Sequence, residues 1–342
     1  MEIEPRSLAV SKSNGVEVLR NLLGFGAGEM IDAIFVAIDF EGCQNIENAF
    51  QTSIDSEFGV AYLDTRDLLH HEEKDPSSFI TTQEFATGSN SRFDKAVKNF
   101  RFGVAERVSI YDLGEKIRQC LNPQDADITN EKRKVIIVRH WRNEMRSVEA
   151  LRIFSHDLRC VHRILDISRT ANELFERPPG CPIGLTKLSS DLSLPFRGED
   201  FHTAGNDANC TLRVLLMLAV KSQENIIPEG PQSKLVALLR QIAQAPLPPT
   251  KSEEEVNRLL AMQPTEPLDD AAQPVDMSRF YVKLTKASLR QRFTQRRQEK
   301  DNDPEERARR AAIRANRDLK EDGENFMGAL QQLEIRVSNA AS

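Results

Sequence analysis

Two acidic residues, Asp39 and Glu41, close an uncharged apolar segment that spans residues 34–38. A short apolar segment of this kind is typical of a strand buried on both faces. Side chains alternate between the faces of a strand, so Asp39 and Glu41 project on the same side. Two like charges held close together disfavour each other's ionisation unless a cation lies between them. The pattern therefore predicts a site for Mg²⁺ or Mn²⁺, although a solvated strand end can carry the same two residues.

A histidine and a third carboxylate occur together further along the chain. His202 precedes Asp207 by five positions, and apolar residues at helical spacing follow over 212–219. Asp207 is therefore expected in the first turn of a helix, which would hold it rigidly. Histidine titrates near neutral pH, which suits a general base that takes a proton from water.

These motifs resemble the DEDDh group of 3′→5′ exonucleases, which have a ribonuclease-H-like fold. In that group an Asp-x-Glu on the first strand, an Asp from the middle of the domain and a late His-x4-Asp meet around two metal ions. The resemblance is strongest to a fungal family that includes the Argonaute-associated quelling exonuclease and yeast proteins linked to mRNA-export helicase suppression. It covers roughly residues 31–222, in the matching segments 34–41, 58–61, 135–140, 164–166 and 202–208.

The resemblance implies a role for each of these residues. Asp39, Glu41 and Asp207 would hold two Mg²⁺ or Mn²⁺ ions, and His202 would be the general base. Two metals about 4 Å apart can activate water and stabilise charge on the attacking and leaving oxygens of a phosphodiester. The implied substrate is a single-stranded end of RNA or DNA, with RNA favoured. An Argonaute-type or mRNA-export protein is the implied partner.

The fourth carboxylate of the group departs from the pattern. Its middle motif has an Asp a few residues after a His that ends the fourth strand, here His140. A gapless alignment puts Met145 at the metal position, whereas a shift of one residue puts Glu144 there. The extra methylene of Glu144 would move its carboxylate by roughly an ångström, enough to hurt catalysis. An active exonuclease and an impaired one that binds nucleic acid or proteins in RNA metabolism therefore both remain open.

Apolar periodicity predicts the elements that position these residues. Three early strands followed by alternating strands and helices predict an α/β fold with a ribonuclease-H-like, mixed five-stranded sheet flanked by helices. Short right-handed crossovers would place the later strands beside the first and Asp39 near the centre of the sheet. The polar residues 66–99 are expected to form a long excursion of unknown role. The expected strands are 34–41, 58–65, 102–111, 134–138 and 161–167, and the expected helices are 16–23, 113–121, 143–154, 168–175, 185–192 and 234–243. A further helix is expected to hold Asp207 in its first turn and to continue through 212–219.

Composition divides the chain into a folded part and polar segments. Of its 342 residues, 39% are hydrophobic, which is less than an all-globular chain of this length would carry. We expect an N-terminal segment over 1–30 and the exonuclease-like domain over 31–222. A Pro-rich linker with a short helix is expected over 223–285, followed by a charged, partly helical tail over 286–342.

The predicted tail is basic. Residues 286–320 carry 12 Lys and Arg against 6 Asp and Glu, although the whole chain has a net charge of -6. Such a segment can contact phosphates, and it can also be a solvated helix. No aromatic residue is interleaved with the basic ones over residues 307–317, so base stacking by this part of the tail is not expected. The candidate phosphate contacts are Arg307, Arg309, Arg310 and Arg314.

Cysteine usage and hydropathy bear on the compartment. The five cysteines are odd in number and form no Cys-x-x-Cys, which favours reduced thiols and argues against a zinc site. No segment approaches the length of a membrane span, and no secretory signal pattern is present. We expect a soluble protein of the cytoplasm or nucleus, with no membrane partner.

Overall fold

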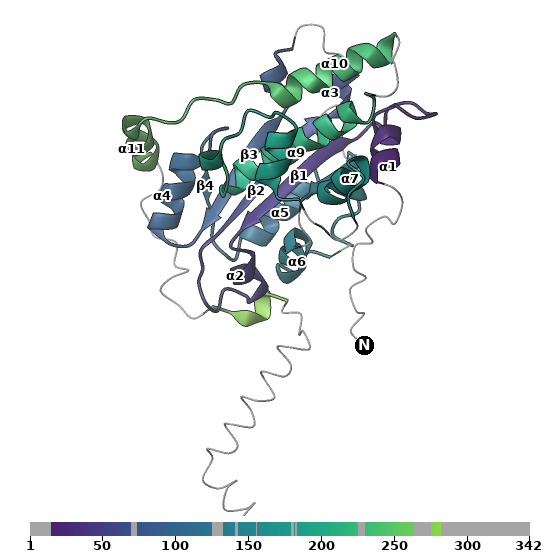
Figure 1. Ribbon diagram of the computed structural model, residues 1–342. Coiled ribbons are helices and arrows are strands. Elements are labelled where there is room, and N and C mark those ends of the chain that lie inside the picture. The colour runs from purple at the N-terminus through teal and green to yellow at the C-terminus, as the bar shows by residue number, and fades with distance from the viewer. Residues whose placement is uncertain are drawn as a thin grey trace, which may run out of the picture. The chain divides into compact units, whose positions relative to one another are not determined.

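A mixed sheet forms the centre of the fold (Figure 1). The computed structural model describes residues 15–69, 74–124, 133–140, 143–154, 156–178, 181, 183–224, 230–262 and 275–281. Within these residues the strand order is β4-β3-β2-β1-β5-β6. The strands are β1 (Ile34–Glu41), β2 (Ser56–Asp64), β3 (Thr81–Thr87), β4 (Glu106–Arg107), β5 (Val135–Arg139) and β6 (Val161–Asp166). Because β1 pairs antiparallel with β2 and parallel with β5, the strand that carries Asp39 is central, as expected.

Helices cover both faces of the sheet, which confirms the predicted α/β class (Figure 1). One apolar core joins β1 residues Phe35 and Ala37 to α9, α7 and α10, and the other joins Val36 and Ile38 to α2, α5 and α6. The helices are α1 (Gly15–Leu22), α2 (Cys43–Glu47), α3 (Thr65–Leu69), α4 (Asn90–Asn99), α5 (Leu113–Leu121), α6 (Asn143–Ala150), α7 (Ile167–Leu174), α8 (Leu185–Asp191), α9 (Ala204–Lys221), α10 (Pro231–Gln244) and α11 (Glu253–Ala261). None of the described helices has the length and apolar composition needed to span a membrane.

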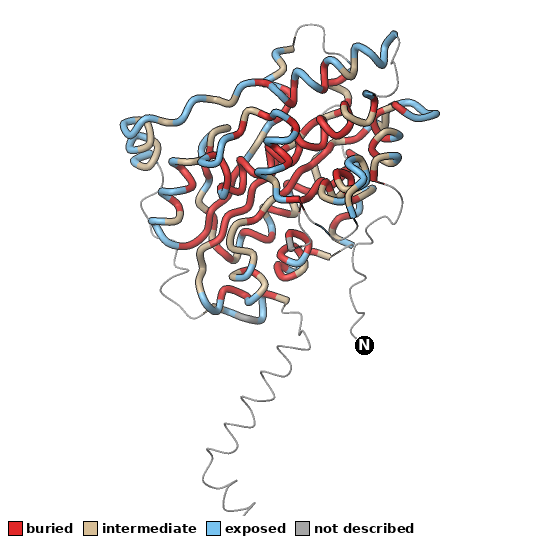
Figure 2. The backbone as a smooth tube through the Cα atoms, in the orientation of Figure 1, coloured by how far each residue is buried: buried red, intermediate tan, exposed pale blue. Residues whose placement is uncertain are grey.

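The central helix α9 lies against β1 and β2. All but the last of its 18 residues are buried, as the red tube of Figure 2 shows. Strand alternation puts Asp39 and Glu41 on the same face of β1 as Phe35 and Ala37, which is the face that α9 covers. The acidic end of β1 therefore points toward the helix that carries Asp207.

The structure corrects the prediction for the third strand. That strand is Thr81–Thr87, inside the stretch 66–99 that was expected to be an excursion, and the same stretch also forms α4. Of the expected strand over 102–111, only Glu106–Arg107 pairs, parallel to β3, so the sheet has six strands instead of five. The first residues of β3, Thr81 to Gln83, are exposed or half-buried, and all three are polar. The start of this strand therefore lacks the apolar residues from which a strand is predicted.

The region expected to be a Pro-rich linker, residues 223–285, contains two helices. Helix α10 packs on the α9 core, and α11 packs beside α4 through Val256, Leu259 and Leu260. Val275 and Phe280 belong to the core that includes α2 and α5. The domain boundaries stay a prediction, and the tail residues Arg307, Arg309, Arg310 and Arg314 lie outside the described residues.

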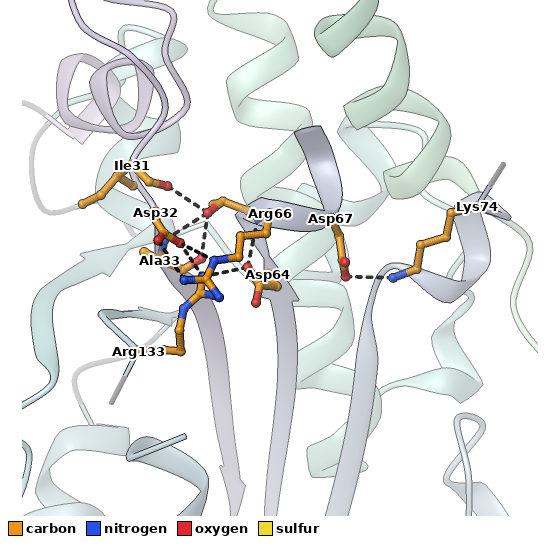
Figure 3. Close-up of polar contacts among 9 residues, drawn as sticks. Ile31, Asp32, Ala33, Asp64, Arg66, Asp67, Lys74 and Arg133 are labelled. Atoms are coloured by element: carbon orange, nitrogen blue, oxygen red, sulfur yellow. Dashed lines mark hydrogen bonds and ion pairs between the residues drawn. The ribbon is translucent and has the colours of Figure 1, made fainter. Parts of the chain in front are cut away.

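An ion-pair network ties three strands together at the end of the sheet opposite to Asp39 (Figure 3). Arg133, just before β5, contacts Asp32 Oδ1 at 2.6 Å and Asp64 Oδ1 at 2.8 Å. Arg66 donates to both oxygens of Asp32, from Nε to Oδ1 and from a terminal nitrogen to Oδ2, each at 3.1 Å. The Arg133 side chain is only 5% exposed, whereas Arg66 is 32% exposed. The buried guanidinium is therefore the member that joins β1, β2 and β5.

Arg133→Met should lower the free energy of unfolding by about 1.5–3 kcal/mol, because two charge-assisted contacts at a buried position are lost. The matched change Arg66→Met, at a more exposed position, should cost less than about 1 kcal/mol. Urea unfolding followed by circular dichroism measures both values. If both variants lose the same free energy of unfolding, the burial of Arg133 does not strengthen its ion pairs.

Candidate active site

Three carboxylates from distant parts of the chain converge at the end of β1. One oxygen from each of Asp39, Glu41 and Asp207 can be chosen so that all three lie within 4.8 Å of one another. Asp39 and Glu41 come from β1, and Asp207 comes from the first turn of α9. The structure therefore brings together the three residues that the sequence singles out as metal ligands. Hard oxygen donors at this density suit Mg²⁺ or Mn²⁺.

A close backbone approach makes this convergence possible. Gly59 lies opposite Asp39 in the β1–β2 pairing. A Cβ atom on Gly59 would lie 2.0 Å from the carbonyl carbon of Ala204 and 2.3 Å from the nitrogen of Gly205. The first turn of α9 therefore rests directly on the backbone of β2, next to Asp39. Sequence analysis did not single out Gly59, and a glycine inside an apolar strand is the signal that was available.

The two oxygens of the Asp207 carboxylate differ in their hydrogen bonds. Its side chain is buried, with 5% of the residue exposed, and Oδ2 accepts a hydrogen bond from the His202 N–H at 2.9 Å. Within the described residues, Oδ1 is buried and has no hydrogen-bond partner. A buried carboxylate oxygen without a donor is costly unless a cation or a proton reaches it. The donor set and this oxygen both fit a divalent ion.

The clustered charges disfavour each other's ionisation. Burial, followed by the charges of Asp207 and Glu144, raises the pKa of Asp39 well above its usual value. Burial and the charge of Glu41 raise the pKa of Asp207 to about 8, against smaller opposing effects of hydrogen bonds from the His202 and Thr203 backbone. Without a cation, the site therefore favours bound protons; a divalent ion would replace them.

His202 lies at the edge of the acidic cluster. Its side chain is 83% exposed, and Nδ1 lies 3.6 Å from Glu41 Oε1. Its backbone has a φ of +63°, a left-handed conformation that is uncommon for a residue other than glycine. This conformation places the His202 N–H on Asp207 while the imidazole stays open to solvent. A group in this position can accept a proton from a water beside the carboxylates.

The structure places the two residues of the doubtful fourth position differently. Glu144 is 2% exposed, and it lies close enough to Asp39 and Cys43 for its charge to raise the pKa of both groups. Met145 packs into the core that includes α5. Glu144 is not one of the three clustered carboxylates. Both alignments therefore stay open, and the role of Glu144 as a ligand stays a prediction.

Two further carboxylates near the site are not predicted from the sequence. Glu57 on β2 lies opposite Glu41, and Glu84 on β3 lies opposite Gly59. Both are almost completely buried. Glu57 lies just before the predicted strand 58–65, and Glu84 lies within the predicted excursion 66–99. The sequence therefore gives neither residue a position relative to Asp39.

Comparison with known families gives a match over most of the described domain. A DEDDh family model, described as DNA polymerase III subunit epsilon-like, C-terminal domain, matches residues 34–218, which is more than half of the chain. The matched region starts at the first residue of β1 and ends inside α9, so it includes Asp39, Glu41, Glu144, His202 and Asp207. No curated protein and no solved structure matches the chain.

Gly59→Ala should destabilise the fold by about 1–3 kcal/mol and weaken Mn²⁺ binding, because the new methyl group would overlap the backbone of α9. Denaturant unfolding and titration calorimetry measure the two effects. In the control Gly28→Ala, at an exposed position outside the helices, nothing lies within 4 Å of the added atom, so stability should change by less than about 0.5 kcal/mol. Wild-type Mn²⁺ affinity in Gly59→Ala would contradict the role given to this contact.

Asp207→Asn should raise the melting temperature of the metal-free protein, and more so at pH 8 than at pH 5. The folded-state pKa of Asp207 lies above its unfolded value, so its contribution to stability falls as the pH rises toward about 8. Each kcal/mol added to the free energy of unfolding should raise the melting temperature by about 2–4 °C. Thermal scans in a chelator measure the shift, and adding Mn²⁺ should then stabilise wild type but not the variant. Asp191→Asn, at an exposed ion pair with Lys187, is the control and should show neither effect.

Proposed function

The chain belongs to the DEDDh exonuclease family, and from this premise we propose that it is a metal-dependent exonuclease that degrades single-stranded nucleic acid from the 3′ end. The convergence of Asp39, Glu41 and Asp207 at the end of β1 carries this proposal. Hydrolysis of a phosphodiester needs concentrated negative ligands for divalent ions and a nearby base, and this site offers both.

Each side chain has a distinct task in the proposed reaction. Asp39, Glu41 and Asp207 would hold two Mg²⁺ or Mn²⁺ ions, which supply Lewis acidity to the phosphodiester when they are bound. The His202 imidazole accepts the proton of the attacking water, since its ring is open to solvent 3.6 Å from Glu41. The hydrogen bond from the His202 N–H to Asp207 fixes the position of the base relative to a ligand.

The finer assignments rest on the resemblance to the fungal quelling-exonuclease and mRNA-export-suppressor family. From that resemblance we propose RNA as the preferred substrate and a role in RNA metabolism. We also propose an Argonaute-type or mRNA-export protein as the partner, in the cytoplasm or nucleus. The basic tail residues Arg307, Arg309, Arg310 and Arg314 would add sequence-independent phosphate contacts.

A second function is favoured by Glu144. In the shifted alignment it stands where the family has an Asp, and it lies outside the group of three carboxylates. A site that lacks the fourth ligand in the right place could bind single-stranded RNA without turnover.

A nuclease assay tests the leading proposal. The protein with Mn²⁺ or Mg²⁺ should shorten 5′-labelled single-stranded RNA in successive steps from the unlabelled end, and DNA of the same sequence more slowly. Asp39→Asn should reduce the rate by at least about 100-fold, and Asp191→Asn should leave it unchanged. No shortening by wild type, with Asp39→Asn behaving identically, would reject the enzyme.

The same preparation separates the second function from the first. A binding module would retain single-stranded RNA in a chelator without cleaving it. Replacing Arg307, Arg309, Arg310 and Arg314 by Gln should then weaken binding and lower the salt dependence of the affinity. Cleavage by wild type, with RNA affinity unaffected by the four changes, would reject the binding module.

A further inference from the structure

Two buried glutamates of the sheet accept hydrogen bonds from the first turn of α9. Glu57 on β2 and Glu84 on β3 are each 1% exposed. Glu57 Oε2 accepts a hydrogen bond from the Ala204 N–H at 3.3 Å, and Glu84 Oε2 accepts one from the Gly205 N–H at 3.3 Å. The first N–H groups of a helix have no partner within the helix. The two glutamates therefore provide acceptors for two consecutive N–H groups of the turn that leads to Asp207.

Basic groups stabilise one carboxylate of this pair much better than the other. Arg92 Nε lies 2.7 Å from Glu57 Oε1, so Glu57 has an ion-pair partner. Lys251 acts on Glu84 only as a lesser influence, after burial and the charge of Glu57. Among the described residues no donor reaches Glu84 Oε1, which is buried. Two ionised carboxylates side by side would leave this oxygen without a partner and add repulsion.

A proton on Glu84 resolves both difficulties. A protonated carboxyl would donate a hydrogen bond to the nearby Glu57 carboxylate, while its other oxygen would still accept one from the Gly205 N–H. Burial and the neighbouring charge of Glu57 raise the pKa of Glu84 well above its usual value, in the same direction. A carboxylic acid kept neutral by an apolar site and used as a hydrogen-bond donor has precedent in enzymes.

We propose that Glu84 is protonated at neutral pH and that its hydrogen bond to Glu57 locks the first turn of α9, so that both glutamates are positioning residues for His202 and Asp207. The consequence for cleavage rests on the proposed function, whereas the consequence for the backbone does not. A Cβ on Gly205 would lie 2.5 Å from the Phe100 ring and 2.9 Å from Glu84 Oε2, so the turn fits closely against these side chains.

The position of this turn matters because it sets where the third ligand lies. Ala204 and Gly205 are three and two residues before Asp207, on the same helical turn. A displacement of about 1 Å at a reacting group can cost 100-fold in rate. Loss of a hydrogen bond behind a metal ligand typically costs 10–100-fold in metal affinity.

Three substitutions in the full chain test the proposal. In Glu84→Gln the carboxamide donates to Glu57 and accepts from Gly205, so it reproduces the protonated acid. Glu84→Leu removes both hydrogen bonds. Glu173→Leu is the matched control, because Glu173 Oε2 accepts from the Gly15 N–H at the start of α1, a helix that carries none of the candidate site residues. For each variant we would measure Mn²⁺ affinity by calorimetry, exchange of the Ala204 and Gly205 amide hydrogens by NMR, and RNA cleavage.

Glu84→Gln should keep Mn²⁺ affinity within about 3-fold of wild type and keep both amides protected. Glu84→Leu should weaken Mn²⁺ binding by about 10–100-fold and expose the Gly205 amide to exchange, and Glu173→Leu should do neither. If Glu84→Gln loses Mn²⁺ as severely as Glu84→Leu, the negative charge of Glu84 is what counts, and the proposal is overturned. Unchanged amide exchange in Glu84→Leu would overturn it as well.

The amide exchange keeps this test independent of the proposed function. If wild type binds Mn²⁺ without cleaving RNA, the nuclease proposal fails while the affinity and exchange measurements still decide the role of Glu84. If Glu84→Leu does not fold, Glu84→Gln decides alone, because a Gln that preserves exchange protection supports the neutral donor and one that loses it refutes the proposal.

Discussion

The contact between the first turn of α9 and the backbone of β2 is the constraint on which the site depends. It requires a residue without a side chain at Gly59, directly across from Asp39. This contact lets a helix that begins at residue 204 deliver Asp207 to two carboxylates more than 160 positions earlier in the chain. Any larger residue at position 59 would separate the helix from the strand, and the carboxylates with it.

Repulsion between these carboxylates lowers the stability of the fold, and interactions elsewhere in the structure must offset this loss. The raised pKa values of Asp39 and Asp207 express this cost, since both groups hold protons more tightly here than in water. The N-terminus of α9 offsets part of it, because a helix start favours negative charge. At the opposite end of the sheet, Arg133 joins the strands through favourable ion pairs with Asp32 and Asp64. The end that carries the candidate chemistry is thus the end that a divalent ion would stabilise most.

Local sequence signals located the elements with the strongest patterns. The uncharged run before Asp39 was long enough to identify β1, and the apolar spacing over 113–121 identified α5 with both ends in place. Weak patterns failed for a physical reason. The start of β3 faces solvent, so its residues are polar, and the short helix α11 covers only the small core beside α4. A strand or helix that buries one small face carries too few apolar residues to be recognised from periodicity alone.

The sequence by itself determined which residue types were available for chemistry: two acids one residue apart at a strand end, and a histidine five positions before a third acid. It also determined the α/β class, because the hydrophobic periods of strands and helices are local properties of the chain. Only the tertiary structure decided that Glu144 lies close enough to Asp39 to raise its pKa while Met145 packs in the core, and that Glu57 and Glu84 contact the first turn of α9. Those facts depend on helix rotation and strand register, which are set by packing between segments far apart in the chain.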